Sequence, residues 1–489
     1  MHQTYLAFDL GAESGRGVLA DFNGEKITLR EVGRFSTSRK INVADFDGVH
    51  RWDFSVIAAE MSSILYRCES EAAGPLSGTA VDTWGVDFGL LDSAGNLLEN
   101  PVWYRDHSHG EAMLLVLSGI PGEALWEQSG IQLMPFNTLF QLAARKKHNP
   151  ELLERAESLL FMPDLLASTL MQSQLRSSEL TIASTSQMLN PRTHQWNTDL
   201  ISALSLPTQM LQPIVSPGTK GGMTKNGTPV YAAAGHDTAS AVAAVPAGDD
   251  TTWAFISSGT WSLVGVERTV PELSLEAFAL GLSNEIGIEG RTRLLKNIMG
   301  LWLVQECRRS LMSGGENYAY EHLTALAGAA PPNGPLIDAA NQRFLAPDDM
   351  PAEIRAACIE SGQRPPETVG ELIRCCLDSL ALAYRKTLAD IERLLDIKFD
   401  VIHVVGGGSK NAVLNRLTAD ACGIPVIAGP DEATAAGNAL SQLVGSGAVN
   451  GWVEARTVCR NSFTPVTFYP QPSAQSFWLE REEVIKNFS

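Results

Sequence analysis

Asp237 is placed where a carboxylate could act on a hydroxyl group. It lies in the stretch AAAGHDTASAVAAV, residues 232–245, where an apolar strand is expected to turn into a helix. A carboxylate within hydrogen-bond reach can accept the proton of a hydroxyl as a new bond forms to its oxygen, typically accelerating the reaction ~10²–10⁴-fold. The competing interpretation is that Asp237 caps the helix, because Asp is a favoured N-cap residue. The two roles are compatible, since helix N–H groups would keep the carboxylate ionised.

Two turns rich in glycine and hydroxyl residues could hold phosphate. DLGAESGR, residues 9–16, and SSGTWS, residues 257–262, each follow an apolar strand. Successive backbone N–H groups in such turns form a nest for anions. Asp9 could hold Mg²⁺ directly or through water, and Thr260 could offer its hydroxyl and N–H to a phosphate. Simple hairpin turns are the alternative, because Gly and Ser are common in turns; one such turn in each half of the chain favours phosphate.

Other nucleotide-binding patterns do not fit the sequence. It contains no Gly-Lys dipeptide, which excludes a Walker P-loop. The stretch GGGSKN, residues 406–411, has Asn411 where the dinucleotide pattern G-x-G-x-x-G has its third glycine. A nicotinamide or flavin site is therefore not expected.

The motifs, taken in order, resemble the FGGY carbohydrate kinases. They are DLGAESGR, DTWGVDFGLLD, YRD, FNTLFQL, MPD, GHDTASAV, SSGTWSLVG, KNIMGLWL and VVGGGSKN, and the match runs from about residue 5 to residue 445. The resemblance implies an α/β fold of two ribonuclease-H-like domains of the actin/hexokinase type, with ATP and sugar in a central cleft. We expect residues 1–245 to hold the sugar and the first phosphate turn, 246–460 to hold the nucleotide, and 461–489 to form a tail that packs back.

The resemblance also assigns roles to individual residues. Asp237 would be the proton acceptor, and Asp9 would be associated with Mg²⁺. The residues implied to bind the sugar are Gly85, His236, Asp237, Thr238 and Asn297. Those implied to bind ATP are Ala12, Glu13, Ser14, Gly15, Arg16, Thr260, Gln305, Gly406, Gly407 and Gly408. Glu13 departs from the family, which usually has a small hydroxyl residue there. A carboxylate beside triphosphate would be repelled unless it points away or helps to hold Mg²⁺.

The implied reaction is ATP-dependent phosphorylation of L-rhamnulose at its 1-hydroxyl, giving L-rhamnulose 1-phosphate in L-rhamnose catabolism. Another ketose (L-fuculose, L-ribulose or xylulose) is the nearest alternative, because a few pocket residues decide between such sugars. An actin- or chaperone-like ATPase or a non-catalytic sugar sensor is more remote, since this chain keeps both Asp9 and Asp237. His236 could bond a sugar hydroxyl or pack, and Trp84 could face the sugar or fill the core. Further contributors to the sugar pocket could be Asp82, Asp87, Tyr104, Arg105 and Asp106.

Composition restricts the partners. The 489 residues predict two or three domains, and a net charge of −18 argues against nucleic acid or an anionic membrane surface. No run approaches the ~20 apolar residues of a membrane helix. The seven cysteines form no C-x-x-C pair, which favours reduced thiols in a cytoplasmic protein. Small-molecule partners and a monomer or homodimer are expected.

The elements expected to position these residues alternate between strands and helices. Residues 4–35 and 251–267 each predict strand hairpins, one per half, as in a weak duplication; residues 78–96 predict another hairpin. Helices are expected to begin at Asn137 and Asn149. Residues 313–370 are rich in Gly, Pro and Ala and predict an irregular insertion. A core stripe at i+3/i+4 spacing then predicts a long helix, carrying Ile373, Leu377, Leu380, Tyr384, Leu388, Ile391 and Leu395.

Overall fold

The computed structural model describes residues 2–37, 40–41, 48–71, 74–173, 176–248, 251–345 and 347–486. The chain divides into two compact units. The first consists of Met1–Pro246, Glu267–Leu294 and Ala433–Phe463, and the second of Ala247–Val266, Leu295–Glu432 and Thr464–Ser489. The chain therefore enters each unit three times.

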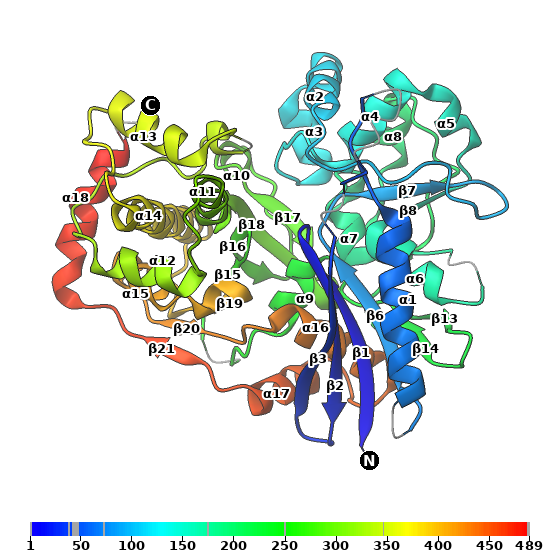
Figure 1. Ribbon diagram of the computed structural model, residues 1–489. Coiled ribbons are helices and arrows are strands. Elements are labelled where there is room, and N and C mark those ends of the chain that lie inside the picture. Colours follow the sequence, from blue (N-terminus) through cyan, green and yellow to red (C-terminus); the bar gives the residue numbers. More distant parts are fainter. Residues whose placement is uncertain are drawn as a thin grey trace. The chain divides into compact units, whose positions relative to one another are not determined.

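The first unit is built on a six-stranded sheet in the order β13-β14-β6-β1-β2-β3 (Figure 1). The strands β1, β2 and β3 form an antiparallel meander, whereas β6 is parallel to β1 and β14 is parallel to β6. These strands are β1 (Gln3–Leu10), β2 (Ser14–Phe22), β3 (Ile27–Ser36), β6 (Gly78–Thr83), β13 (Lys220–Met223) and β14 (Pro229–Tyr231). The hairpin predicted at residues 4–35 is confirmed.

Helices pack against both faces of this sheet. Leu6, Phe8 and Leu10 alternate along β1 and share one apolar cluster with α1 (Phe54–Glu71) and α6 (Met162–Leu170). The intervening residues face α16 (Ala433–Ser446), which also packs on α9 (Asp237–Ala243). That packing is close: a Cβ on Gly437 would lie 1.8 Å from the carbonyl oxygen of Ser240. Asp9 follows the same alternation and so lies on the α16 side.

The hairpin predicted at residues 78–96 is wrong. The strand β6 pairs with β1 and β14, whereas β7 (Phe88–Leu91) pairs antiparallel with β8 (Ser158–Phe161). Both runs are apolar and buried, so their pattern alone could not identify their partners. Between them the chain turns at Val86, whose φ is 68°.

A second apolar core of this unit forms around β7 and β8. Its helices include those expected to begin after Asn137 and Asn149, although neither Asn side chain caps its helix. The helices are α2 (Ser108–Gly119), α3 (Gly122–Ser129), α4 (Thr138–His148), α5 (Pro150–Arg155), α7 (Leu180–Ser184) and α8 (Thr198–Ala203). Outside this core, α10 (Leu275–Ala279) contacts α3, and α17 (Trp452–Ser462) packs on α16 and β3. Short strands are β4 (Lys40–Ile41), β5 (Arg51–Trp52), β9 (Ser178–Glu179), β10 (Leu189–Asn190), β11 (Gln195–Trp196) and β12 (Ile214–Val215).

The second sheet repeats the strand order of the first when the first is read from β3 to β13. Its order is β17-β18-β16-β15-β19-β20-β21. The strands β15 and β16 form an antiparallel hairpin, as β1 and β2 do, and β19 and β20 follow in parallel. Its strands are β15 (Trp253–Ser258), β16 (Trp261–Arg268), β17 (Ser283–Ile286), β18 (Thr292–Met299), β19 (Val401–Val405), β20 (Val426–Ala428) and β21 (Val466–Phe468). The division between the units runs through β16 and β18. The shared order, in which a hairpin is extended by parallel strands, confirms the expected duplication and the α/β class.

The long helix α14 (Val369–Leu395) is confirmed and begins with a capping box between Thr368 and Glu371. Figure 1 shows it end-on beside α11 (Trp302–Ser313), α12 (Tyr320–Ala329) and α15 (Ala412–Cys422). Cys375 and Cys376 are buried on it, as packing residues would be. The expectation of an irregular segment at 313–370 is wrong, because α12 and α13 (Met350–Glu360) form there; their buried Leu, Ala and Ile positions outweigh the flanking Pro and Gly. The last helix, α18 (Gln475–Lys486), contacts α15.

No helix among the described residues is both long enough and apolar enough to cross a membrane.

Candidate active site

Three carboxylates meet where parallel strands of the first sheet end. Asp9 lies opposite Asp82 in the parallel register of β1 and β6. The next residue on β6, Thr83, forms a parallel bridge with His236, and its N–H donates to the carbonyl of Gly235 at 2.9 Å. This places Asp237 beside the same edge. Open α/β sheets bind ligands outside the carboxyl ends of their strands, so this edge is the candidate site.

Asp9 forms a salt bridge with Arg16 on the neighbouring strand β2. The two lie across from each other in β1 and β2, and Nη2 and Nε of Arg16 donate to Oδ2 of Asp9 at 2.7 and 3.1 Å. The turn between them is fixed by Thr37, whose hydroxyl donates to the carbonyl of Gly11 at 2.7 Å. The Glu13 side chain is exposed, while its carbonyl accepts the N–H of Thr37. Thr37, directly after β3, thus holds the turn with both its hydroxyl and its N–H.

Asp82 is fully buried beside Asp9. Asn438 of α16 donates to its Oδ2 at 2.7 Å, and its Oδ1 has no hydrogen-bond partner among the described residues. Burial and the neighbouring carboxylate of Asp9 raise the pKa of Asp82 well above its ordinary value, and Asp237 adds to that rise. Carboxylate oxygens are the protein ligands that Mg²⁺ prefers, and a divalent cation would relieve this repulsion. The acids present therefore fit a magnesium ion associated with Asp9.

Asp237 presents one oxygen to the protein and keeps the other free. Its Oδ1 accepts from the N–H of Thr238 at 2.6 Å and lies 3.4 Å from Nε2 of His236. No described residue bonds to Oδ2, and a third of the side chain is exposed. Burial and Asp9 raise the pKa of Asp237, partly offset by His236. Oδ2 is therefore the atom available to accept a proton.

The expected helix cap needs a correction. Asp237 is the first residue of α9, and the N-cap position belongs to His236, which makes no side-chain cap bond. The Asp237 carboxylate does accept a backbone N–H at the helix start, but that N–H belongs to the next residue. Its placement one position into the helix aims it at the sheet edge.

Gly85 lies directly against His236. A Cβ at Gly85 would approach Nε2 of His236 to 3.3 Å and the hydroxyl of Thr185 to 3.5 Å. The same hydroxyl accepts the N–H of Val86 at 3.2 Å. The imidazole itself is buried, with 9% of its side-chain surface exposed. Gly85, His236, Asp237 and Thr238 are thus brought together at one edge.

Trp84 belongs to the core. It is buried in the cluster of α1 and α6, and its indole N–H donates to Oδ2 of Asp87 at 2.9 Å. Trp52 donates to the same oxygen at 2.6 Å, and Gln141 donates to Oδ1 at 2.9 Å. Burial raises the pKa of Asp87 to about 7 despite these three donors. Asp87 therefore holds the loop after β6 in place.

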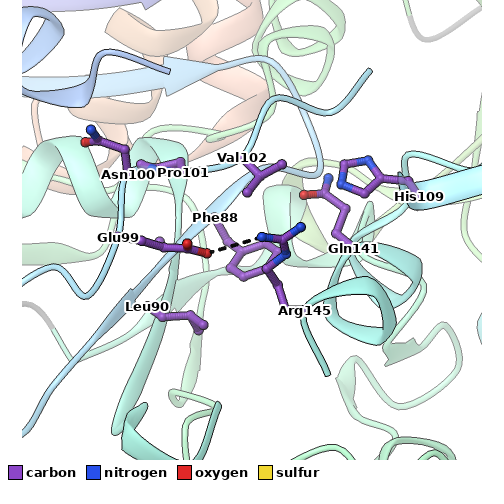
Figure 2. Close-up of a pocket in the computed structure, with 10 residues that line it drawn as sticks. Phe88, Leu90, Glu99, Asn100, Pro101, Val102, His109, Gln141 and Arg145 are labelled. Atoms are coloured by element: carbon purple, nitrogen blue, oxygen red, sulfur yellow. Dashed lines mark ion pairs between the residues drawn. The ribbon is translucent and has the colours of Figure 1, made fainter. Parts of the chain in front are cut away.

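Gln141 also lines a small cavity, together with Phe88, Glu99 and Arg145 (Figure 2). Its volume is about 10 Å³, enough for about one water molecule and far too small for a sugar. Arg145 lines it, 3.8 Å from Glu99, with Nε and Nη2 unpaired among the described residues. Burial lowers the pKa of His109 to about 4, and its Nδ1 contacts the carbonyl of Tyr104, so its Nε2 is an acceptor. Donors facing an acceptor suit a structural water.

The remaining pocket candidates form a structural group beside β5. Tyr104 stacks on Trp52, and Nε of Arg105 donates to the Tyr104 hydroxyl at 3.0 Å. Asp106 accepts from the N–H of His50 at 3.0 Å and from the Ser108 hydroxyl at 2.6 Å. Burial opposes ionisation, yet these bonds lower the pKa of Asp106 to about 2. The contacts of these three residues are with the protein.

In the second unit, Thr260 sits in the tight turn between β15 and β16. The carbonyl of Thr260 accepts from the N–H groups of Gly300 and Trp302, each at 3.1 Å. A Cβ on Gly300 would lie 2.5 Å from the hydroxyl of Ser262, so only glycine fits this approach. The turn after β18 therefore fixes the turn that carries Thr260, whose side chain is half-buried.

The glycine loop after β19 lies at the same sheet edge as the Thr260 turn. The register of β15 and β19 pairs Ser257 with Val405, so both strands end together. Gly406 has a φ of 80°, and a Cβ on Gly408 would lie 2.0 Å from the hydroxyl of Ser258. A Cβ on Gly407 would meet no heavy atom within 4 Å. Gly407 is thus the open point of the loop.

The two other predicted residues of this unit lie on neighbouring elements. Gln305 is on α11, directly after the turn that holds Thr260, and its Oε1 is buried without a hydrogen-bond partner among the described residues. Asn297 is half-buried on β18, three residues before Gly300. Both flank the same turn.

Sequence reasoning missed Glu285 and Arg293, which support His236. Glu285 is buried on β17 and Arg293 on β18, and both stand in the segment SNEIGIEGRTRLL. An acid and a base in two apolar strands were the available signal. This signal does not predict the pair, because the partner of a buried charge cannot be identified from the sequence.

The architecture is that of two-domain carbohydrate kinases. The chain superposes on a gluconate kinase from Lactobacillus acidophilus with a TM-score of 0.79 and 14% identity, over 99% of this chain and 97% of that one. A Plasmodium falciparum glycerol kinase with ADP gives 0.76 and 14%, over 98% of each chain. These similarities define the fold class.

The chain belongs to the FGGY family of carbohydrate kinases. The N-terminal domain of that family matches residues 4–256 and its C-terminal domain matches residues 254–446. Among relatives, a rhamnulokinase from Bacteroides thetaiotaomicron is 39% identical over 97% of either chain, and one from Enterococcus faecalis is 40% identical over 96% of this chain and 95% of that one. The protein is therefore a sugar kinase.

Proposed function

We propose that the protein transfers the γ-phosphate of ATP to the 1-hydroxyl of L-rhamnulose, giving L-rhamnulose 1-phosphate in the breakdown of L-rhamnose. The single observation that carries the chemistry is the orientation of Asp237, whose Oδ1 is bonded to Thr238 and whose Oδ2 is free. The choice of sugar rests on the full-length similarity to rhamnulokinases.

In the proposed mechanism, Asp237 accepts the proton of the sugar hydroxyl through Oδ2. The N–H of Thr238 keeps Oδ1 occupied, so the carboxylate cannot rotate away. Gly85 leaves room for the sugar beside His236, whose Nε2 faces the same space. Phosphoryl transfer depends on such positioning and on charge stabilisation more than on covalent catalysis.

The residues proposed for ATP lie at the two turns and the glycine loop. Ala12 to Arg16 and Thr260 would border the phosphates, and Gly406 to Gly408 would border the adenine side. Gln305 would also line the nucleotide site. Glu13 would contribute through its backbone, because its side chain is exposed. Asn297 would bind the sugar. Asp9 would hold Mg²⁺, which neutralises phosphate charge when bound.

A panel of ketoses tests the substrate. L-Rhamnulose, L-fuculose, L-ribulose and xylulose are each supplied with ATP, and ADP release is measured by a coupled assay with and without Mg²⁺. We expect the highest kcat/KM for L-rhamnulose and no turnover without Mg²⁺. A preference for another ketose would assign that sugar instead, and no ADP release with any ketose would refute the kinase proposal. Because ATP is the phosphate donor, we propose a cytoplasmic location, and size-exclusion chromatography distinguishes monomer from homodimer.

A further inference from the structure

A buried ion pair holds His236 from the side opposite Asp237. Oε2 of Glu285 lies 3.0 Å from Nδ1 of His236 and 3.0 Å from Nη2 of Arg293. The Arg293 side chain has no exposed surface and that of Glu285 has 6%. Nε2 of the same imidazole lies 3.4 Å from Oδ1 of Asp237. The imidazole thus lies between two carboxylates, one structural and one proposed to be catalytic.

We propose that Glu285 and Arg293 are positioning residues for the acceptor site: they fix His236 through Nδ1, which holds Nε2 against Asp237 and the sugar hydroxyl. The proposal rests on the sugar-kinase function and adds two residues to it. They contact neither sugar nor phosphate in this account, and they act only through His236.

The hydrogen-bond donors determine which nitrogen of His236 carries a proton. Nη2 of Arg293 has two hydrogens, and two oxygens accept them: Oε2 of Glu285 at 3.0 Å and the carbonyl of Ile286 at 3.3 Å. The 3.2 Å contact between this Nη2 and Nδ1 of His236 is then not needed as a donor bond. Nδ1 instead donates its own proton to the carboxylate of Glu285. This second carboxylate contact fixes the tautomer and orientation of the ring.

The charge of Glu285 supports that arrangement. Burial would raise the pKa of Glu285, but His236 and Arg293 outweigh burial and lower it below its ordinary value. The carboxylate is therefore ionised inside the protein and available as an acceptor. Arg293 supplies the opposite charge, without which a buried carboxylate would be strongly destabilising.

The consequence for Asp237 follows from the geometry of the ring. With Nδ1 tied to Glu285, the imidazole cannot flip, and Nε2 stays beside Oδ1 of Asp237. The N–H of Thr238 holds Oδ1 and leaves Oδ2 for the sugar, while the fixed ring keeps Nε2 in its place beside that carboxylate. A misplacement of about 1 Å at a catalytic group can cost ~10²-fold in rate. Loss of the support should thus reduce kcat.

The first test removes both charges together, because removing one partner of a buried ion pair is strongly destabilising. The variant Glu285→Leu/Arg293→Met, which leaves no acceptor for Nδ1, is compared with the wild type, with His236→Asn and with the triple variant in the ketose-kinase assay. We expect kcat to fall about 10–100-fold in the double variant, with KM for ATP unchanged. In the His236→Asn background the same two substitutions should cost less than about threefold, because effects transmitted through one residue are not additive. Glu289→Gln, an exposed acid on the same segment, should behave as the wild type.

The kinetic outcomes separate positioning from general structure. A wild-type kcat in the double variant, or an equal loss with and without His236, would overturn the proposal. The second test needs no substitution: ¹⁵N NMR of the labelled wild-type imidazoles, with His236→Asn used to assign the signal. We expect a protonated Nδ1 on His236, and an unprotonated Nδ1 would overturn the proposal even if no variant folds. The NMR result is independent of turnover, so a wild type without ketose-kinase activity would refute the proposed function separately.

Discussion

Asp9 and Asp82 lie opposite each other in the parallel register of β1 and β6, one paired with Arg16 and the other bonded to Asn438. The second carboxylate is fully buried, and its neighbour helps to raise its pKa. Strand pairing alone therefore places two like charges side by side at the sheet edge. An arrangement with this electrostatic cost suits a site that receives a cation.

Asp9→Asn should weaken the binding of Mg²⁺ at this edge. We expect the Mg²⁺ concentration for half-maximal activity to rise by about tenfold or more, because even the loss of groups behind a metal ligand costs 10–100-fold in affinity. The measurement is a Mg²⁺ titration of initial rates at fixed ATP and sugar. The control is Asp21→Asn, a change at a half-buried position on β2. An unchanged Mg²⁺ requirement in Asp9→Asn would contradict the role proposed for Asp9.

Asp237→Asn should remove the proton acceptor while keeping the local fold, since the amide oxygen can still accept the N–H of Thr238. We expect kcat to fall ~10²–10⁴-fold with KM for ATP unchanged. Steady-state kinetics in both substrates, with a thermal melt for folding, measure this. If phosphorylation continues near the wild-type rate with unchanged ATP affinity, the proton-acceptor role is wrong.

How far the sequence could predict this site depended on whether its residues are neighbours along the chain. Asp9 with Arg16, and His236 with Asp237, lie within one turn or one strand junction, and their motifs were visible. The pairing of His236 with Glu285 joins residues 49 positions apart, and Asp82 meets Asn438 across 356. Such contacts depend on tertiary packing.

The fold shows the same limit. The long helix over residues 373–395 and the two hairpins around residues 11 and 259 could be predicted, because each depends on local spacing. The partner of β7 was not, because buried apolar strands have no pattern that specifies a neighbour. Composition also misled at residues 313–370, where Pro and Gly border helices rather than replace them.

The buried Asp87 should make stability fall as the pH rises. Its pKa is about 7 in the folded protein and near 3.8 when unfolded, so the native state binds the extra proton between those values. Unfolding then releases a proton, and this group's contribution to the free energy of unfolding decreases by about 4 kcal/mol from pH 4 to above pH 7. Asp87→Asn should make the dependence of that free energy on pH shallower, as measured by urea unfolding at several pH values. Asp199→Asn, an exposed control, should leave the slope unchanged; an unchanged slope in Asp87→Asn would refute the assignment.

Two adjacent glycines separate packing from nucleotide binding in the loop after β19. In Gly408→Ala the new methyl would lie 2.0 Å from the hydroxyl of Ser258, whereas in Gly407→Ala it would meet no protein atom within 4 Å. We expect Gly408→Ala to lose about 1–3 kcal/mol of stability through overpacking. Gly407→Ala should keep the wild-type melting temperature but raise KM for ATP, because its methyl would occupy space proposed for the nucleotide. Thermal melts and ATP titrations measure the two effects separately. A stable Gly407→Ala variant with wild-type KM for ATP would place the nucleotide away from this loop, and a Gly408→Ala variant as stable as the wild type would show that Ser258 can move aside.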